Sequence, residues 1–269
     1  MVQMTNCDQA QNLFNQGKFK EASEQFRCLA SQSVDLLERA SYLLDAANCY
    51  WRVGNFEEAT ACAAAAKRFS SADVVACAQV DFFMATLLIA QNKREQGVEE
   101  LAAILVRYSD KLGEGEGREL YQQIQIQRGF SFMHLSRYSD ARPLLEEAVH
   151  FQMPDSVLSD ICCNLGRCYH ELALYDNARQ QFERAQALGV SEEWQPTFHY
   201  YFGYTLYELK DFAKARRELI LCLQSGAGPP KAYTYEMLAA TSRKLGEREE
   251  ARAYDKMAKA SSSQSDPRT

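Results

Sequence analysis

One stretch of the sequence could place reactive side chains on a common surface. Cys163, Arg167, His170 and Glu171 lie at positions i, i+4, i+7 and i+8, so they share one face of a predicted helix. Such a face could hold a Cys/His nucleophile pair or two zinc ligands. Residues 163 and 170 are separated by two helical turns, a rise of about 10 Å, which is too long for either arrangement. We therefore expect a polar part of a binding groove here, without a catalytic residue or a metal ligand.

The rest of the chain offers no alternative reactive motif. The four histidines belong to no HExxH or related metal motif, and the glycines at 113, 115 and 117 alternate with glutamates and lack the lysine of a phosphate loop. The nine cysteines are an odd number without CxxC pairs, which favours reduced thiols in an intracellular protein over a disulfide framework. We predict a protein that is not an enzyme and that uses no cofactor.

Composition restricts the fold and the class of partner. Only 13 glycines and 6 prolines occur among 269 residues, too few for the frequent turns of a β-sandwich or barrel, so an all-α protein is predicted. The net charge of −6 and the lack of a basic block argue against nucleic acid as a partner. The longest apolar run, 82–90, is too short to span a membrane, and residues 1–10 do not resemble a secretory signal. A cytoplasmic location without membrane insertion is expected.

A pair of small residues separated by twelve positions recurs seven times along the chain. The pairs are Ala10/Ala22, Ala47/Ala59, Ala85/Gly97, Gly129/Ala141, Gly166/Ala178, Gly203/Ala215 and Ala239/Ala251. An aromatic residue stands three positions before the second member in five of the seven copies. Small residues let two antiparallel helices approach closely, and the aromatic ring fills the wedge after the turn. Each copy is therefore predicted to be a helical hairpin that must stack on its neighbours.

The repeat resembles the tetratricopeptide repeat family. The fullest copy runs from Leu165 and Gly166 through Tyr169, Ala178 and Phe182, with Cys162 in place of the signature Trp. The resemblance implies a right-handed α-solenoid of about seven hairpins, although successive copies are 36 to 44 residues apart rather than the usual 34. The family's clamp for chaperone C-termini needs lysines that this chain lacks at the matching positions, so that ligand is not predicted.

The domain organisation follows from the repeat positions. Residues 1–108 are expected to hold repeats one to three and residues 119–259 repeats four to seven. The intervening Gly/Glu-rich segment, 109–118, is predicted to be a long loop, with a hinge as the alternative. The Ser-rich end, 260–269, is predicted to be a disordered tail.

The resemblance implies that a peptide or a partner helix binds the concave groove lined by the first helix of each hairpin. Helical phase assigns to this groove Asn48, Phe82, Phe130, Asn164, Arg167, His170, Tyr200, Tyr201, Tyr204, Tyr207 and Tyr233. We call the last five of these the tyrosine wall. Tyrosine combines a large contact area with a polar tip and is frequent at binding hot spots. The alternative is that these rings pack against an adjacent repeat or the C-terminal helix.

Two functions fit these features. The first is a non-catalytic adaptor or scaffold that binds a protein or peptide in the groove, with the tyrosine wall as the main contact. The second is a regulatory sensor, in which a signalling peptide or small molecule in the groove changes the superhelix through segment 109–118. The identity of the partner and the oligomeric state do not follow from the sequence.

Overall fold

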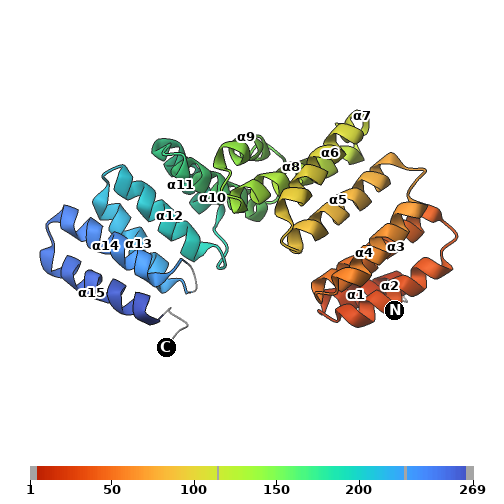
Figure 1. The fold of residues 1–269 in the computed structure, drawn as a ribbon, viewed down its shortest axis with the longest axis horizontal. Helices are drawn as coiled ribbons and strands as arrows, with labels where there is room; N and C mark the ends of the chain where they lie inside the picture. The colour runs from red at the N-terminus through yellow and green to blue at the C-terminus, as the bar shows by residue number, and fades with distance from the viewer. Residues whose placement is uncertain (1–4, 114, 227–228, 265–269) are drawn as a thin grey trace. The chain divides into compact units, whose positions relative to one another are not determined.

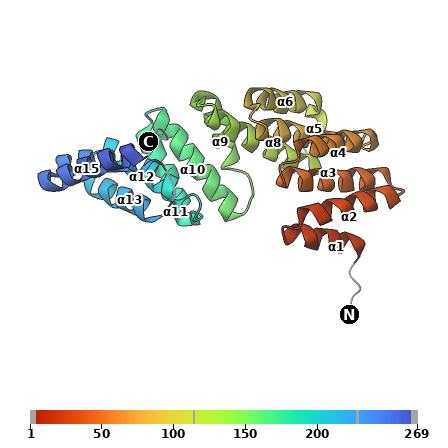
Figure 2. The ribbon, with the colours of Figure 1, turned by 60° about the horizontal axis from the view of Figure 1, so that its bottom comes forward.

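The computed structural model describes residues 5–113, 115–226 and 229–264, and every secondary-structure element in these ranges is an α-helix. These described ranges contain fifteen helices, and the chain divides into two compact units, residues 1–131 and 132–269. The first unit contains α1 (Asn6–Asn15), α2 (Phe19–Gln32), α3 (Leu36–Arg52), α4 (Phe56–Phe69), α5 (Val74–Ala90), α6 (Arg94–Arg107), α7 (Ser109–Leu112) and most of α8 (Glu116–His134). Figure 2 shows α1, α2 and α3 stacked side by side in this unit.

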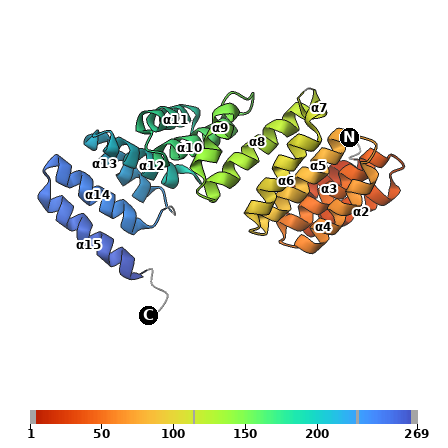
Figure 3. The ribbon, with the colours of Figure 1, turned by 45° about the horizontal axis from the view of Figure 1, so that its top comes forward.

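The second unit begins within the last turn of α8. It contains α9 (Tyr138–Ala148), α10 (Asp155–Glu171), α11 (Tyr175–Leu188), α12 (Gln195–Glu208), α13 (Phe212–Gln224), α14 (Lys231–Leu245) and α15 (Arg248–Gln264). Consecutive helices pack as pairs, and the pair α14 and α15 is seen side by side at the blue end of the chain in Figures 1 and 3. The described helices thus include six packed hairpins (α1/α2, α3/α4, α5/α6, α10/α11, α12/α13 and α14/α15), and a short turn joins α8 to α9, which confirms the predicted all-α solenoid of helical hairpins.

The turn inside each hairpin has one backbone conformation, repeated seven times. The seventh residue after the first small residue of the pair always has positive φ: Gly17, Gly54, Asn92, Ser136, Ala173, Lys210 and Gly246. Around each of these residues two backbone N–H groups bond back to the end of the first helix, as in Leu174 N–H to Tyr169 O (2.8 Å) and Ala173 N–H to His170 O (2.9 Å). These are the two hydrogen bonds of a Schellman motif. The constant spacing in the sequence therefore reflects a constant turn.

The small residues lie where the helices pack most closely. All fourteen members of the seven pairs are buried. A Cβ atom added to Gly166 would lie only 2.8 Å from Cε1 of Phe182, and one added to Gly203 would lie 2.9 Å from Cγ of Leu219. Glycine at these two positions therefore allows α10 and α12 to pack closely against the following helix.

Two predicted segment boundaries are wrong. Segment 109–118 is not a simple loop, because Ser109–Leu112 form α7 and α8 already begins at Glu116. The predicted disordered tail, 260–269, is helical up to Gln264, since α15 continues through the serines and Ser262 donates to the carbonyl of Ala258 (3.0 Å). Residues 265–269 lie outside the described part of the chain.

No helix in the described ranges is long and apolar enough to span a membrane.

Candidate functional site

The second unit brings the central residues of the tyrosine wall together with His170. These side chains come from two first helices, α10 and α12, which pack against each other. The His170 ring centre lies 4.5 Å from that of Tyr204 and 5.6 Å from that of Tyr201. Tyr200 in turn contacts Tyr201 edge-on at 5.3 Å and Tyr204 at 6.3 Å. The predicted cluster of groove residues thus forms one continuous aromatic surface.

This surface borders a cavity of about 270 Å³, which we call the aromatic cavity. Its lining comes from the end of α10, the following turn, the start of α11 and the middle of α12: His170, Glu171, Ala173, Tyr175, Tyr200, Tyr201 and Tyr204. The Schellman turn at Ala173 directs the chain from α10 into α11 and so brings Tyr175 to 5.6 Å from His170. The cavity is therefore built around the repeat that carries the fullest signature.

His170 is held in one orientation by a hydrogen-bond chain. The hydroxyl of Thr205 donates its proton to the carbonyl of Tyr201 (2.7 Å), and the same oxygen lies 3.0 Å from Nδ1 of His170. Because that hydroxyl has only one proton, Nδ1 of His170 must be the donor, which leaves Nε2 as an acceptor. Burial lowers the pKa of His170 to about 4, so the ring is uncharged at neutral pH.

The tyrosines keep their protons across the physiological range. Burial, with the neighbouring Tyr201 and Tyr204, raises the pKa of Tyr200 to about 12. Burial and then the charge of Glu208 raise the pKa of both Tyr204 and Tyr175. The phenols therefore act as neutral hydrogen-bonding groups.

Arg167, one turn before His170, contributes a cation at the edge of this cluster. Its guanidinium carbon lies 5.1 Å from the centre of the Tyr201 ring, within the range of a cation–π contact. Burial raises the pKa of Tyr201, and the charge of Arg167 opposes this rise. Arg167, one of the predicted groove residues, therefore lies next to this cluster as a partner of Tyr201.

The remaining predicted groove residues lie outside the aromatic cavity. Tyr207 packs against Phe212 at 5.5 Å, Tyr233 is 54% exposed on α14, and Asn164 is buried with its amide donating to the carbonyl of Asp160 (2.8 Å). In the first unit, Phe82 packs against the core, and Asn48 and Phe130 are half-buried. The tyrosine wall thus contains one residue packed within its own hairpin, Tyr207, and one exposed residue, Tyr233.

The arrangement of Cys163 does not suit a nucleophile. Burial, followed by the charge of Asp160, raises the pKa of Cys163 to about 12, so the thiol stays protonated. His170 bonds Thr205 rather than this thiol, in agreement with the spacing argument. Within the described residues, no group of three or more His, Cys, Asp or Glu side chains could hold a metal ion.

Sequence reasoning missed three members of the site. Tyr175 was expected only as a wedge between helices, and Thr205 and Ala173 carried no functional prediction. The one usable signal is that Thr205 lies four residues after Tyr201, where a threonine hydroxyl reaches the earlier carbonyl.

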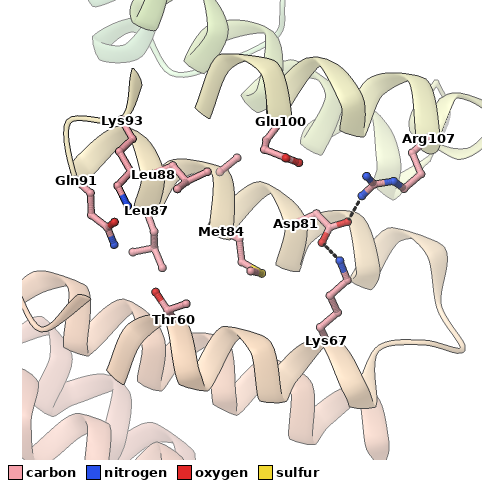
Figure 4. A pocket seen from close by; sticks show the side chains of 11 residues that line it. Thr60, Lys67, Asp81, Met84, Leu87, Leu88, Gln91, Lys93, Glu100 and Arg107 are labelled. Carbon is pink, nitrogen blue, oxygen red and sulfur yellow. Dashed lines mark hydrogen bonds and ion pairs between the residues drawn. The ribbon is translucent and has the colours of Figure 1, made fainter. Parts of the chain in front are cut away.

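A second cavity, of about 420 Å³, lies in the first unit among α4, α5 and α6. Figure 4 shows Asp81 of α5 between Lys67 of α4 and Arg107 of α6. Asp81 is 7% exposed and also accepts from the hydroxyl of Tyr108 (2.8 Å). Burial alone would raise the pKa of Asp81, but Lys67, Tyr108 and Arg107 lower it below its usual value. The carboxylate is fully engaged in joining three helices, so we assign this network a structural role.

Comparison with known proteins agrees with the repeat assignment. The family model described as tetratricopeptide repeat matches residues 159–188, which comprise most of α10, the Schellman turn and α11. No curated protein sequence matches the chain.

Solved structures share the fold along most of the chain. A structure from a functional characterisation of Pseudomonas aeruginosa pilF is 18% identical, with a TM-score of 0.63, over 82% of this chain and 90% of that one. A tetratricopeptide repeat protein from Parabacteroides merdae is 13% identical, with a TM-score of 0.56, over 95% and 91%. A signal transduction ATPase with a tetratricopeptide repeat sensor, from Pyrococcus horikoshii, is 17% identical, with a TM-score of 0.73, over 95% of this chain and 41% of that one.

The sequence match shows that the fifth hairpin is a tetratricopeptide repeat, and the same turn in all seven hairpins and the shared fold show that the chain has the fold of tetratricopeptide repeat proteins.

Proposed function

We propose that this protein is a non-catalytic, cytoplasmic adaptor that binds a segment of a partner protein on the tyrosine wall and the aromatic cavity. The observation that carries the proposal is the joining of His170, Tyr201 and Tyr204 into one half-accessible surface on two neighbouring first helices. Tetratricopeptide repeat proteins are in general scaffolds for protein partners, and the groove residues here are of the type that forms hot spots.

The surface is already ordered before a partner binds. His170 is fixed by Thr205, and Tyr201 is held between His170 and Arg167. Side chains that are held in place lose little conformational entropy on binding, which favours affinity. Tyr233, more than half exposed, extends the candidate surface onto α14 of the final hairpin.

Site-specific photo-crosslinking tests the adaptor function. p-Benzoylphenylalanine would replace Tyr204 or Tyr233 in the full chain, and Val34, which is 95% exposed in the first unit, would be the control position. The proposal expects the same partner segment to crosslink at both tyrosine positions and not at residue 34. Crosslinks of equal yield at all three positions, or at residue 34 alone, would contradict it.

A sensor is the second candidate. It is supported by the Pyrococcus horikoshii protein, whose tetratricopeptide repeats are described as a sensor. In this chain the candidate region of change is the short segment between α7 and α8, where Gly115 has positive φ. Small-angle scattering of the full chain, with and without the crosslinked partner segment as a synthetic peptide, separates the two. A sensor changes its radius of gyration on binding, whereas a rigid adaptor does not.

A further inference from the structure

We propose that the aromatic cavity receives a basic side chain, the lysine ammonium or arginine guanidinium of the partner segment. This inference rests on the proposed function for its biological setting, but the cavity itself can be tested without the partner. Three properties of the described residues support it: the arrangement of aromatic rings, the balance of charge and the hydrogen-bonding state of His170.

Four tyrosine rings border one space. Tyr175, Tyr200, Tyr201 and Tyr204 all line the cavity, and they come from two helices, α11 and α12. Cations are attracted to the faces of aromatic rings at distances up to about 6 Å, and a cage of several rings is the arrangement that recognises ammonium groups. One face of this cluster already has a cation next to it, because the Arg167 guanidinium lies 5.1 Å from the Tyr201 ring centre. The chain itself thus provides an example of the contact that we propose.

The charges near the cavity favour a cation over an anion. Glu171 lines the cavity and is exposed, and Glu208 lies close enough to raise the pKa of Tyr175 and Tyr204. The Arg167 guanidinium lies against the ring of Tyr201, and His170 is uncharged at neutral pH. An anionic ligand would face two carboxylates, whereas a cation would be attracted by them.

The hydrogen-bonding groups of the cavity also match a donor. His170 lines the cavity, and its Nε2 is an acceptor because Nδ1 donates to Thr205. The carboxylate of Glu171 is an acceptor only. Lysine and arginine have several N–H donors and no acceptor, so either side chain complements this set. A carboxylate or phosphate can only accept, so it could bond the tyrosine hydroxyls but neither Nε2 of His170 nor the Glu171 carboxylate.

Two small probes that differ only in the charged end distinguish a cation site from an apolar site. N-acetyl-lysine methylamide and N-acetyl-norleucine methylamide would be titrated into full-length protein labelled with [13Cε]tyrosine. The Tyr200, Tyr201 and Tyr204 signals would be assigned by single Tyr→Phe variants. We expect the lysine probe to shift these three signals at millimolar concentration and the norleucine probe to leave them in place.

Charge variants test whether the carboxylate takes part. Glu171→Gln removes one negative charge from the cavity and should weaken binding of the lysine probe about fivefold at low salt, from a Coulomb energy of about 1 kcal/mol at 4 Å in water. Glu192→Gln, an exposed glutamate before α12, is the matched control and should leave the affinity unchanged. Equal shifts with both probes, no shift with either probe, or equal weakening by both variants would overturn the proposal.

The outcomes also separate this inference from the adaptor function. In one outcome, a partner segment crosslinks at residue 204 but contains no lysine or arginine, and the lysine probe shifts no tyrosine signal. This outcome would support the adaptor function and refute the proposal that the cavity receives a basic side chain. In the opposite outcome, the lysine probe binds but no partner crosslinks. This outcome would support the cation-binding role of the aromatic cavity and contradict the adaptor function.

Discussion

Replacing Gly166 by alanine tests whether the repeat glycine is required by close helix packing. Helix propensity alone favours alanine by about 1 kcal/mol. Against this, the new Cβ would lie 2.8, 2.9 and 3.0 Å from three ring atoms of Phe182. That ring is 1% exposed and is held by Phe198 and Phe202, whose ring centres lie 5.8 and 5.6 Å away. Because the ring has no free space, overpacking should cost about 2–3 kcal/mol. The net expectation is a destabilisation of about 1–2 kcal/mol.

A second substitution isolates this contact. Phe182→Leu removes the ring and should cost about 1–1.5 kcal/mol alone, but in the double variant it also relieves the clash. The double variant should therefore be at least about 1 kcal/mol more stable than the sum of the single effects predicts. The assay is urea unfolding followed by the fluorescence of Trp194 in a Trp51→Phe background, so that the signal reports the second unit. A stabilised Gly166→Ala variant, or strictly additive effects, would refute the packing argument.

Three further predictions concern other parts of the chain. Ala173→Gly should stabilise the second unit by about 0.5 kcal/mol in the same unfolding assay, because Ala173 has φ +57° and glycine adopts this conformation without strain; an unchanged or lower stability would contradict this. Asp81→Asn should cost about 1–2 kcal/mol at pH 7, since its two basic partners are about half exposed. The pKa of Asp81 is lowered in the folded state, so its contribution to the free energy of unfolding is complete above a pH of about 4 and disappears as the pH falls through the folded pKa. A difference in unfolding free energy between wild type and variant that does not shrink in acid would refute this prediction. Iodoacetamide at pH 7.5 should modify the exposed Cys7 and Cys28 well before Cys163, because the pKa of the Cys163 thiol is raised to about 12. Peptide mass spectrometry would follow the modification, and early modification of Cys163 would restore the hypothesis that it is a nucleophile.

The fold could be predicted from the sequence because the repeat combines two strong local constraints. The twelve-residue spacing of small residues follows from close helix packing, and the Schellman turn fixes what lies between them. The turn itself was less visible, since Ala173 and Lys210 carry no glycine signal although both have positive φ. The helical end of the chain was missed because the composition of 260–264 resembles a linker, while the preceding helix continues through it.

The site was predictable only in part. Periodicity correctly placed Tyr200, Tyr201 and Tyr204 on the first helix of the sixth hairpin, but it does not give the rotation of that helix relative to the preceding hairpin. This rotation decides that the ring of His170 meets that of Tyr204. Contacts between hairpins depend on long-range packing, and a single repeat carries no local signal for them.

Affinity capture tests the central claim, that a partner segment binds the tyrosine wall, most directly. Full-length wild type would be compared with a Tyr204→Ala/Tyr233→Ala variant and with a Val34→Ala/Val106→Ala control, whose residues are 95% and 80% exposed in the first unit. Circular dichroism would verify that all three proteins are folded, and quantitative mass spectrometry would compare the proteins that they capture from native lysate. We predict that a specific protein is captured by the wild type and the control and lost from the tyrosine variant. Identical captures by all three proteins would contradict the claim.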